Sequence, residues 1–306
     1  MHETSASRTA LVTSLMRAVH ARFDRPTLIE DPWGEWLVPE SDRIAIQELV
    51  TSALDAEVRS RVDGLGSSDA ILHAALRINP LYGTVIVRTR YAEDALERAV
   101  AHGARQYVIV GAGMDSFALR RPAFARDLEV FEIDHPATQE LKRRRLRECA
   151  VELPSGLHFI AADLSQEQLS AALTRSPFRN DEPAFFSWLG VTTYLTRDAN
   201  LATLRAIAVC AVRGSELVFT YLDQRELDPD RQSTAIRDVR ARVASMGEPM
   251  VSGFDPTELE RDLRDVGLTL VEDLGGEELG ARYCKERKDG LAPAGTAHIA
   301  LARVDT

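Results

Sequence analysis

The sequence predicts an α/β fold built around a mostly parallel β-sheet, and three observations support this. From residue 106 onward, short apolar stretches rich in β-branched and aromatic residues alternate with helical stretches of roughly a dozen residues. Strands connected in this way pair in parallel, because the crossover helix returns the chain to the same end of the sheet. A glycine turn, Gly111 to Gly113, follows the first such strand. The 306 residues, 45% of them hydrophobic, suffice to bury one large core with additions.

The first hundred residues are predicted to be helical. Thr9 to Arg22 carries apolar residues at helical spacing, and Asp31-Pro32 opens a second, short helix. Between Gly83 and His102 one apolar stripe follows the helical period, formed by Val85, Ala92, Ala95, Leu96 and Ala99. Arg88 falls inside this stripe, whereas Arg90 falls on the opposite face with Glu93, Asp94 and Glu97. Only Arg88 therefore requires a functional explanation.

The expected strands follow in chain order: QYVIV, LEVFEI, LHFIA, AFFSWL and ELVFTYL, and then LTLVEDL and AHIALARV near the end. Pro136 suits the first turn of a helix, and residues 255–258, DPTE, predict the start of another helix that ends at Gly267. Residues 223–254 interrupt the alternation with a charged helical segment, RQSTAIRDVRARVASMG. The glycine-rich connection over residues 275–295 is expected to be a long loop.

Composition and charge exclude several functional classes. The net charge of −10 argues against a nucleic-acid partner, and the basic run Lys142–Arg145 is interpreted as a solvated helix face. The cysteines Cys149, Cys210 and Cys284 lie far apart, so neither a disulfide framework nor a metal site is indicated. No apolar run reaches the roughly 18 residues of a membrane span, and the N-terminus lacks a signal-peptide core. We therefore expect a cytoplasmic protein, and the sequence carries no indication of its oligomeric state.

The glycine turn is interpreted as a nucleotide cradle. Gly111, Ala112 and Gly113 lie directly after a strand, where glycines let the backbone approach a ligand. The dinucleotide fingerprint would require glycine or alanine where Ser116 stands, and the carboxylate of Asp115 would repel a pyrophosphate. A tight turn without a ligand is the alternative.

Acidic residues stand at the ends of the next two strands. Asp134 ends the second strand, about twenty residues after the glycine turn, where an acid can bind both hydroxyls of a ribose. Glu132 points to the same side by strand alternation but lies further from the tip. Asp163 ends the third strand and is placed to bind an adenine amine, with Leu164 packing on the ring. The alternatives are a solvated strand end for Asp134 and a helix cap for Asp163.

The residues at these strand ends predict a site for one nucleoside, and no residue is predicted to bind a phosphate. An adenosine ligand without phosphates suggests S-adenosyl-L-methionine. Its amino-acid carboxylate requires a cation, and Arg88 on an otherwise apolar helix face is the natural donor. A snorkelling arginine at the edge of the stripe is the alternative.

The chain closely resembles the leucine carboxyl methyltransferase-like family of bacterial S-adenosylmethionine-dependent methyltransferases. The segments that carry the resemblance are, in order, TALVTSLMRAVHARFDRPTLIEDPWG, VRTRYAEDAL, VIVGAGMDSFALR, FEIDHPATQELKRRRL, HFIAADL, SWLGVTTYLT and SGFDPTELERDLRDVGL. The resemblance implies a class I methyltransferase, Rossmann-like fold, with seven strands of which the last, AHIALARV, is antiparallel. It also implies a helical cover (1–82) over a core (83–306) with an insertion at about 223–254. The family's cofactor contacts fall on Arg88, Gly111, Asp134, Asp163 and Leu164.

Two departures from the family pattern bear on the methyl acceptor. Members of this family that methylate a protein C-terminus are similar in carrying an arginine at the position of Ser165 and an acid at the position of Leu189. The resemblance to small-molecule O-methyltransferases of secondary metabolism is therefore closer. In those enzymes Tyr194 lies near the acceptor, so it is the candidate for orienting the acceptor oxygen, with a packing role as the alternative. Trp188 either faces the cofactor or is a buried strand aromatic, and the second is favoured.

Methyl transfer from a sulfonium is an in-line displacement in which positioning and exclusion of water supply most of the acceleration. A carboxylate acceptor needs no base, whereas a phenol or alcohol would gain from His20, His135 or Tyr194. Trp33, Trp36 and Met246 are expected to line the acceptor site. The rivals are an NAD-dependent Rossmann oxidoreductase and a non-catalytic S-adenosylmethionine-binding protein. No tyrosine has a lysine four residues on, so the short-chain dehydrogenase dyad is absent.

Overall fold

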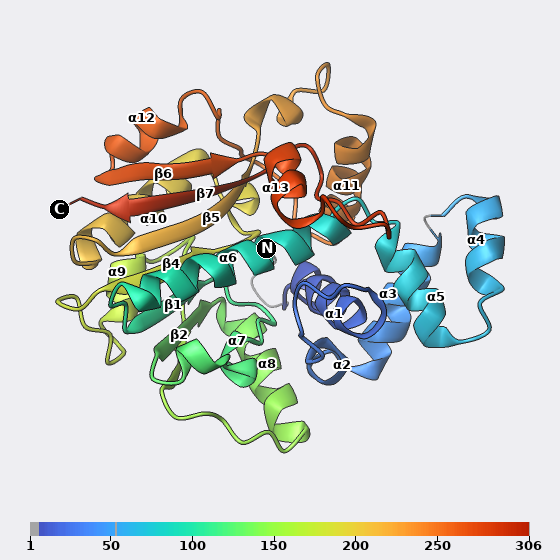
Figure 1. Cartoon of the computed structure of the whole chain (residues 1–306), viewed down its shortest axis with the longest axis horizontal. Helices are drawn as coiled ribbons and strands as arrows, with labels where there is room; N and C mark the ends of the chain where they lie inside the picture. The colour runs from blue at the N-terminus through green and yellow to red at the C-terminus, as the bar shows by residue number, and fades with distance from the viewer. Residues whose placement is uncertain (1–5, 53, 306) are drawn as a thin grey trace.

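The core of the protein is one β-sheet whose central strands are parallel. The computed structural model describes residues 6–52 and 54–305 (Figure 1). The seven strands lie in the order β3-β2-β1-β4-β5-β7-β6, and β7 runs antiparallel to both of its neighbours. They are β1 (Gln106–Val110), β2 (Glu129–Asp134), β3 (Leu157–Ala161), β4 (Ala184–Trp188), β5 (Glu216–Leu222), β6 (Leu268–Leu274) and β7 (Ala297–Val304). The predicted α/β fold, with an antiparallel last strand, is confirmed.

Helices flank both faces of the sheet. They are α1 (Arg8–Phe23), α2 (Gly34–Leu37), α3 (Glu40–Ser52), α4 (Ala56–Asp63), α5 (Ser68–Arg77), α6 (Tyr82–Ala101), α7 (Phe117–Arg120), α8 (Pro136–Glu148), α9 (Leu169–Leu173), α10 (Arg197–Cys210), α11 (Thr234–Ser245), α12 (Leu259–Arg264) and α13 (Gly276–Tyr283). Short 3₁₀ turns are η1 (Ala123–Ala125), η2 (Thr192–Tyr194) and η3 (Gln224–Leu227). Among the described residues no single helix is long and apolar enough to span a membrane. The pair α5 and α6, bent by 83° at their junction, meets that test only together.

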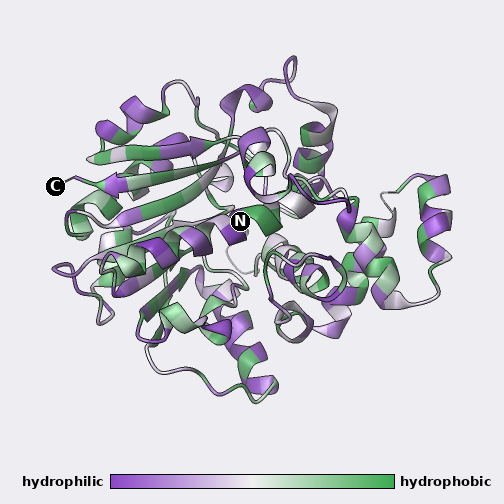
Figure 2. Ribbon diagram, in the orientation of Figure 1, coloured by the Kyte–Doolittle hydropathy of each residue, from purple (hydrophilic) through white to green (hydrophobic). Residues whose placement is uncertain are grey.

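Strand β1 is buried on both sides because each of its faces packs against a helical layer. Tyr107 and Ile109 join the core cluster that includes α1 and α6, whereas Val108 and Val110 join the cluster that includes α9, α10 and α12. Figure 2 shows largely hydrophobic strands, and many hydrophilic residues on α8 and α12. Strands β1 to β4 pair in parallel, so their carboxyl ends meet at one edge of the sheet.

Three segments differ from their sequence-based predictions. Helix α12 begins at Leu259 rather than at residue 255, because the Asp255 side chain accepts the Thr257 backbone N–H at 2.9 Å and forms a separate turn. Helix α13 lies inside the connection that was expected to be a loop. Its Gly276 serves packing, since a Cβ atom there would lie 2.2 Å from the Ala294 carbonyl oxygen. Helix α9 is a single short turn, five residues long.

The basic run on α8 is only partly solvated. Arg143 and Arg144 are exposed as expected, but Lys142 is 1% exposed and its Nζ pairs with the carboxylate of Glu132 on β2. Burial raises the pKa of Glu132 to about 7, although the ammonium of Lys142 opposes this. Glu132 is therefore a buried structural partner, and the solvated interpretation was wrong for Lys142.

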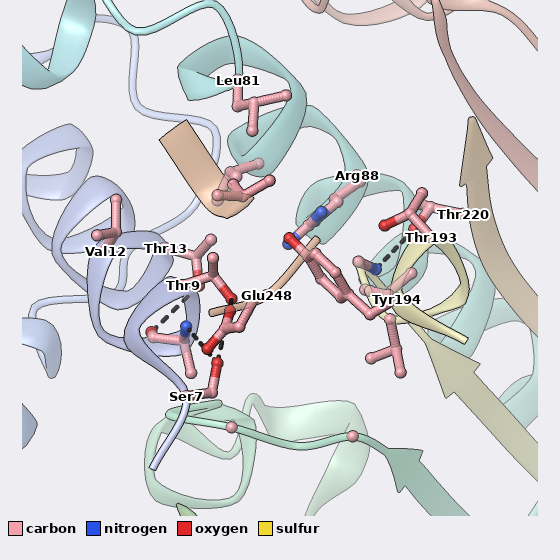
Figure 3. A pocket seen from close by; sticks show the side chains of 18 of the residues that line it. Ser7, Thr9, Val12, Thr13, Leu81, Arg88, Thr193, Tyr194, Thr220 and Glu248 are labelled. Carbon is pink, nitrogen blue, oxygen red and sulfur yellow. Dashed lines mark hydrogen bonds between the residues drawn. The ribbon is translucent and has the colours of Figure 1, made fainter. Parts of the chain in front are cut away.

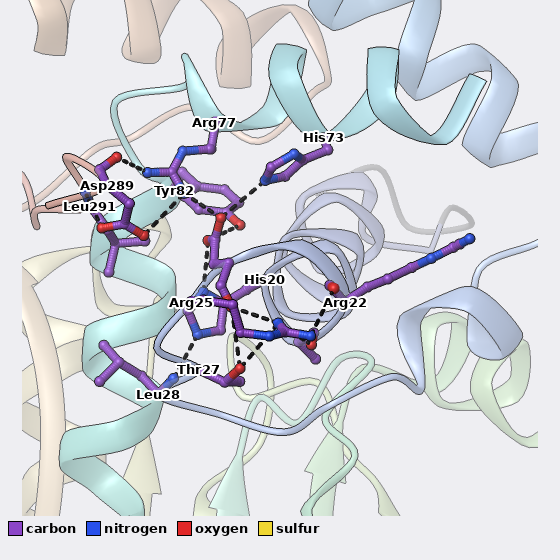
Figure 4. A network of polar contacts seen from close by, with 12 residues as sticks. His20, Arg22, Arg25, Thr27, Leu28, His73, Arg77, Tyr82, Asp289 and Leu291 are labelled. Atoms are coloured by element: carbon purple, nitrogen blue, oxygen red, sulfur yellow. Dashed lines mark hydrogen bonds and ion pairs between the residues drawn. The ribbon is translucent and has the colours of Figure 1, made fainter. Parts of the chain in front are cut away.

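A buried carboxylate, Asp24, joins α1 to α5 and α6. Its partners are labelled in Figure 4. It accepts hydrogen bonds from His73 Nε2 at 3.0 Å and from the Tyr82 hydroxyl at 2.7 Å, and it pairs with Arg77. Burial alone would raise the pKa of Asp24, but hydrogen bonds from His20, His73 and Tyr82, together with Arg77, hold it well below its usual range. Asp24 thus holds α1, α5 and α6 together.

His20 belongs to this network and not to a catalytic site. Its Nδ1 lies 2.8 Å from Asp24 Oδ2, and its Nε2 accepts the Leu28 backbone N–H at 2.9 Å, so both ring nitrogens are engaged. The side chain is fully buried. The prediction of His20 as a base for the acceptor was therefore wrong.

Candidate active site

A cavity of about 540 Å³ lies over the carboxyl ends of the central strands (Figure 3). Its floor is the glycine turn after β1 and the ends of β2 to β5, and its sides come from α6 and the loop after β4. Helix α1 and the segment around α11 complete it from outside the sheet. Segments that lie far apart in the sequence therefore meet around one cavity.

The glycine turn has a backbone that requires glycine. Gly111 has φ +71° and Gly113 has φ +53°, both in the left-handed region. A Cβ atom at Gly111 would lie 2.5 Å from Val191 Cγ2, and one at Gly113 would lie 3.0 Å from Ala10 Cβ. The turn leads into α7, which is only four residues long. The cradle therefore consists of the turn that lines the cavity rather than of a long helix N-terminus.

Asp134 is fixed beside this turn. Its carboxylate accepts the Gly113 backbone N–H through Oδ2 and the His135 backbone N–H, at 2.6 Å, through Oδ1. Burial raises the pKa of Asp134, and these two donors oppose the rise. Each oxygen keeps a further acceptor position, and the side chain lines the cavity. A hydroxyl-bearing ligand on the turn would meet this carboxylate in one fixed orientation.

Asp163 and Leu164 line the cavity at the end of β3. Asp163 Oδ1 accepts the Ser165 backbone N–H at 3.0 Å and the Ser165 hydroxyl at 2.7 Å. Burial would raise the pKa of Asp163, but the bonds from Ser165 and the nearby His135 lower it below its usual value. Asp163 does not cap α9, whose N-cap is Gln168. The helix-cap alternative was therefore wrong.

Arg88 points from α6 into the cavity (Figure 3). Arg90 does not line the cavity and pairs with Asp94 at 2.7 Å. Within residues 6–52 and 54–305, no acceptor forms a hydrogen bond or ion pair with the Arg88 guanidinium. Burial lowers the pKa of Arg88 to about 10. Gly190, with φ +71°, leaves room for this group, since a Cβ atom there would lie 2.5 Å from Nη1. Among the described residues, the Arg88 guanidinium is therefore available to pair with an anionic group of a ligand.

Tyr194 lies in η2, and its ring points toward Arg88 in the cavity (Figure 3). Burial raises the pKa of Tyr194 to about 12, and the nearby Glu248 acts in the same direction. At neutral pH its hydroxyl therefore keeps its proton and can donate a hydrogen bond, but it cannot serve as a base.

The predicted tryptophan contacts are not part of the cavity. Trp188 is fully buried in the core cluster on the α10 side of the sheet, as the favoured interpretation held. Neither Trp33 nor Trp36 belongs to the lining, and Trp36 is 53% exposed, so these two expectations were wrong. Met246, in contrast, does line the cavity.

Two residues that line the cavity, Glu248 and Arg17, were not predicted from the sequence. Glu248 follows α11 and is almost fully buried, although acids are rarely buried. Arg17 on α1 pairs with Asp31 at 2.7 Å and donates to the Met114 carbonyl at 2.7 Å, beside the glycine turn. No local pattern marks either group, because their partners are distant in the sequence.

One part of the cavity wall is apolar, and we name it the acceptor lobe. It lies between α1, α6 and α11 and is formed by aliphatic and thioether side chains: Val12, Met16, Leu81, Ile236, Val239, Val243, Met246 and Met250. Arg242 adds a cation to this wall, and no hydrogen bond or ion pair joins its guanidinium to another described residue. An apolar molecule with one polar or anionic group would match such a surface.

Comparison with known proteins identifies relatives of the whole chain. A family model for leucine carboxyl methyltransferase matches residues 10–208. YktD of Bacillus subtilis (strain 168), a candidate S-adenosyl-L-methionine-dependent methyltransferase, is 32% identical over 303 residues, which cover 97% of this chain and 98% of YktD. A candidate of the same description from Mycobacterium avium (strain 104) is 31% identical over 273 residues, or 87% of this chain and 80% of that protein.

Two solved structures share the fold at low sequence identity. A candidate methyltransferase from Thermobifida fusca YX has a TM-score of 0.60 at 15% identity, covering 100% of this chain and 97% of that one. A DUF574 family protein from Streptomyces avermitilis MA-4680 has a TM-score of 0.54 at 16% identity, covering 85% and 95%. These likenesses concern the fold alone, and they agree with the predicted class I methyltransferase architecture.

Proposed function

This chain belongs to the leucine carboxyl methyltransferase family, and from that premise we propose that it transfers a methyl group to an oxygen atom of a small molecule. It is an S-adenosylmethionine-dependent methyltransferase. The nature of the acceptor and the roles of individual residues are our proposal, as is the division into a helical cover (1–82) and a core (83–306) with an insertion at about 223–254.

The cavity residues fit S-adenosylmethionine. In the proposed assignment the Gly111–Gly113 backbone lies against the nucleoside, Asp134 binds the ribose hydroxyls, and Asp163 and Leu164 receive the adenine. Arg88 binds the amino-acid carboxylate. The observation that carries this assignment is the Arg88 guanidinium, which has no hydrogen-bond or ion-pair partner among the described residues and lies in the same cavity as the two strand-end acids and the glycine turn. A carboxylate is the partner that a planar guanidinium matches best.

When bound, S-adenosylmethionine supplies an electrophilic methyl group. The chain then has to orient the acceptor and exclude water. Tyr194 is proposed to donate its hydroxyl proton in a hydrogen bond to the acceptor oxygen. His135 lies beside Asp163, with 3.9 Å between its Nε2 and Asp163 Oδ2, and therefore at the proposed adenine position. A carboxylate or an acidic phenol, which needs no base, suits these residues best.

A small acceptor is favoured over a protein C-terminus, and a role in secondary metabolism follows as part of the proposal. Ser165 and Leu189 lie in the cavity wall and supply no charge for a peptide carboxylate. The acceptor lobe is apolar, which suits a compact apolar molecule. Arg242 on its wall would complement an acidic group on that molecule.

Calorimetric titration with S-adenosylmethionine, S-adenosylhomocysteine and NADH tests the cofactor assignment directly. We expect the first two to bind and NADH not to bind. Incubation of a lysate with a methyl-labelled cofactor tests the acceptor, and we expect label in the small-molecule fraction. Label confined to protein C-termini would overturn the small-molecule assignment, and binding of NADH alone would revive the oxidoreductase alternative.

Replacing Asp134 is expected to weaken cofactor binding selectively. Asp134→Ala removes the proposed charge-assisted bonds to the ribose, at a cost of about 1.5–3 kcal/mol, or roughly one to two decades in Kd. Calorimetry with S-adenosylhomocysteine measures the change. Asp127→Ala, at an exposed position before β2, is the control and should bind like the wild type. Unchanged affinity in Asp134→Ala would remove the ribose assignment.

A further inference from the structure

Glu248 connects the segment after α11 to the first turn of α1. Gly247, with φ +83°, turns the chain at the end of α11, and the Glu248 backbone N–H donates to the Val243 carbonyl at 3.0 Å. The side chain, 6% exposed, accepts the Arg8 backbone N–H at 2.9 Å through Oε1 and the Thr9 hydroxyl through Oε2. We call these two contacts the Glu248 clasp (Figure 3).

The first turn of α1 lies directly over the proposed cofactor site. Ala10 is so close to Gly113 that a Cβ atom there would lie 3.0 Å from Ala10 Cβ. On its other side the turn is held by α8, because the Ser7 backbone N–H donates to Thr138 Oγ1 at 3.0 Å. Ser7 and Thr9 both line the cavity. The turn therefore covers the glycine cradle, and Glu248 is one of its anchors.

We infer that Glu248 is a positioning residue that holds the first turn of α1 over the bound nucleoside and thereby slows its release. The inference rests on the proposed function, because it takes the cavity to hold S-adenosylmethionine. A carboxylate that accepts two donors at a buried position forms stronger hydrogen bonds than a neutral group would. Loss of a cover acts chiefly on the dissociation rate, since most affinity differences between variants of one site lie there.

Surface plasmon resonance on the immobilised full chain, with S-adenosylhomocysteine as the probe, tests the clasp. Glu248→Ala is expected to raise the dissociation rate about tenfold and to change the association rate much less. Glu248→Gln keeps one carbonyl acceptor and should fall between wild type and alanine. Asp238→Ala removes an exposed acid from α11 and should match the wild type. Hydrogen exchange without ligand should be faster at the Arg8 amide in Glu248→Ala.

The outcomes separate the clasp from the proposed function. If wild type binds the probe and Glu248→Ala releases it at the wild-type rate, the clasp is overturned and the cofactor assignment stands. If the wild type does not bind, both are overturned. Should Glu248→Ala fail to fold, Thr9→Val removes the hydroxyl donor from the opposite side of the same contact. A faster release in that variant supports the clasp, and an unchanged rate overturns it.

Discussion

Arg88→Ala is expected to lower the affinity for S-adenosylmethionine by two decades or more, which is at least about 3 kcal/mol. The variant removes the proposed partner of the cofactor carboxylate, and no other unpaired cation lies at the glycine turn within the described residues. Arg17, another arginine close to the turn, is already engaged with Asp31 and the Met114 carbonyl. Calorimetric titration of the purified variant measures the loss.

Arg90→Ala is the matched control for Arg88→Ala. Arg90 lies two residues further along α6, so the same type of residue is removed from the same helix, but its guanidinium pairs with Asp94 outside the cavity. Affinity in this variant should remain within about twofold of wild type, because Arg90 does not line the cavity. Equal losses in the two variants would contradict the assignment of Arg88.

Asp24→Asn is expected to destabilise the fold by about 3–5 kcal/mol, the usual cost of breaking a buried ion pair from one side. The change leaves Arg77 without its buried partner, and it places amide hydrogens against donors from His73 and Tyr82. Tm should fall by at least about 6 °C in a thermal melt. Asp69→Asn is the control, since Asp69 forms an exposed ion pair with Arg22, and its Tm should change little.

The destabilisation by Asp24→Asn should depend on pH in one direction. The pKa of Asp24 is lowered in the folded protein, so its charge stabilises the fold above the unfolded pKa of about 3.9. This contribution is lost as the pH falls through the folded value. Urea unfolding should therefore show the full difference between wild type and variant at pH 7, and a shrinking difference below about pH 4. A difference that grows on acidification would contradict this.

The sequence was most informative where local pattern and burial agree. The strand QYVIV, its glycine turn and the acids at residues 134 and 163 are read from short segments, because parallel strands bring their carboxyl ends together whatever the rest of the chain does. The phase of α6 likewise separated Arg88 from Arg90, since one helical stripe decides which of them faces the sheet.

The residues that escaped prediction depend on contacts between distant segments. Lys142 belongs to a run of charges that is typical of a solvated face, and only its contact with Glu132 on β2 explains its burial. Glu248 binds residues 240 and 239 positions away, so nothing in its neighbourhood indicates a role. Helix α13 was expected to be a loop because its glycines resemble turn residues, whereas Gly276 is required by the nearby Ala294 carbonyl.

The antiparallel direction of β7 has a practical consequence for handling the protein. Because β7 runs against β5, Ala297 pairs with Leu222 beside the cavity, whereas Arg303 pairs with Glu216 at the opposite edge of the sheet. The chain therefore leaves the sheet on the side away from the site, while Ser7 lies in the cavity wall. An affinity tag or fluorescent label attached after β7 therefore stays away from the site, whereas one placed directly before Ser7 would lie beside the cavity.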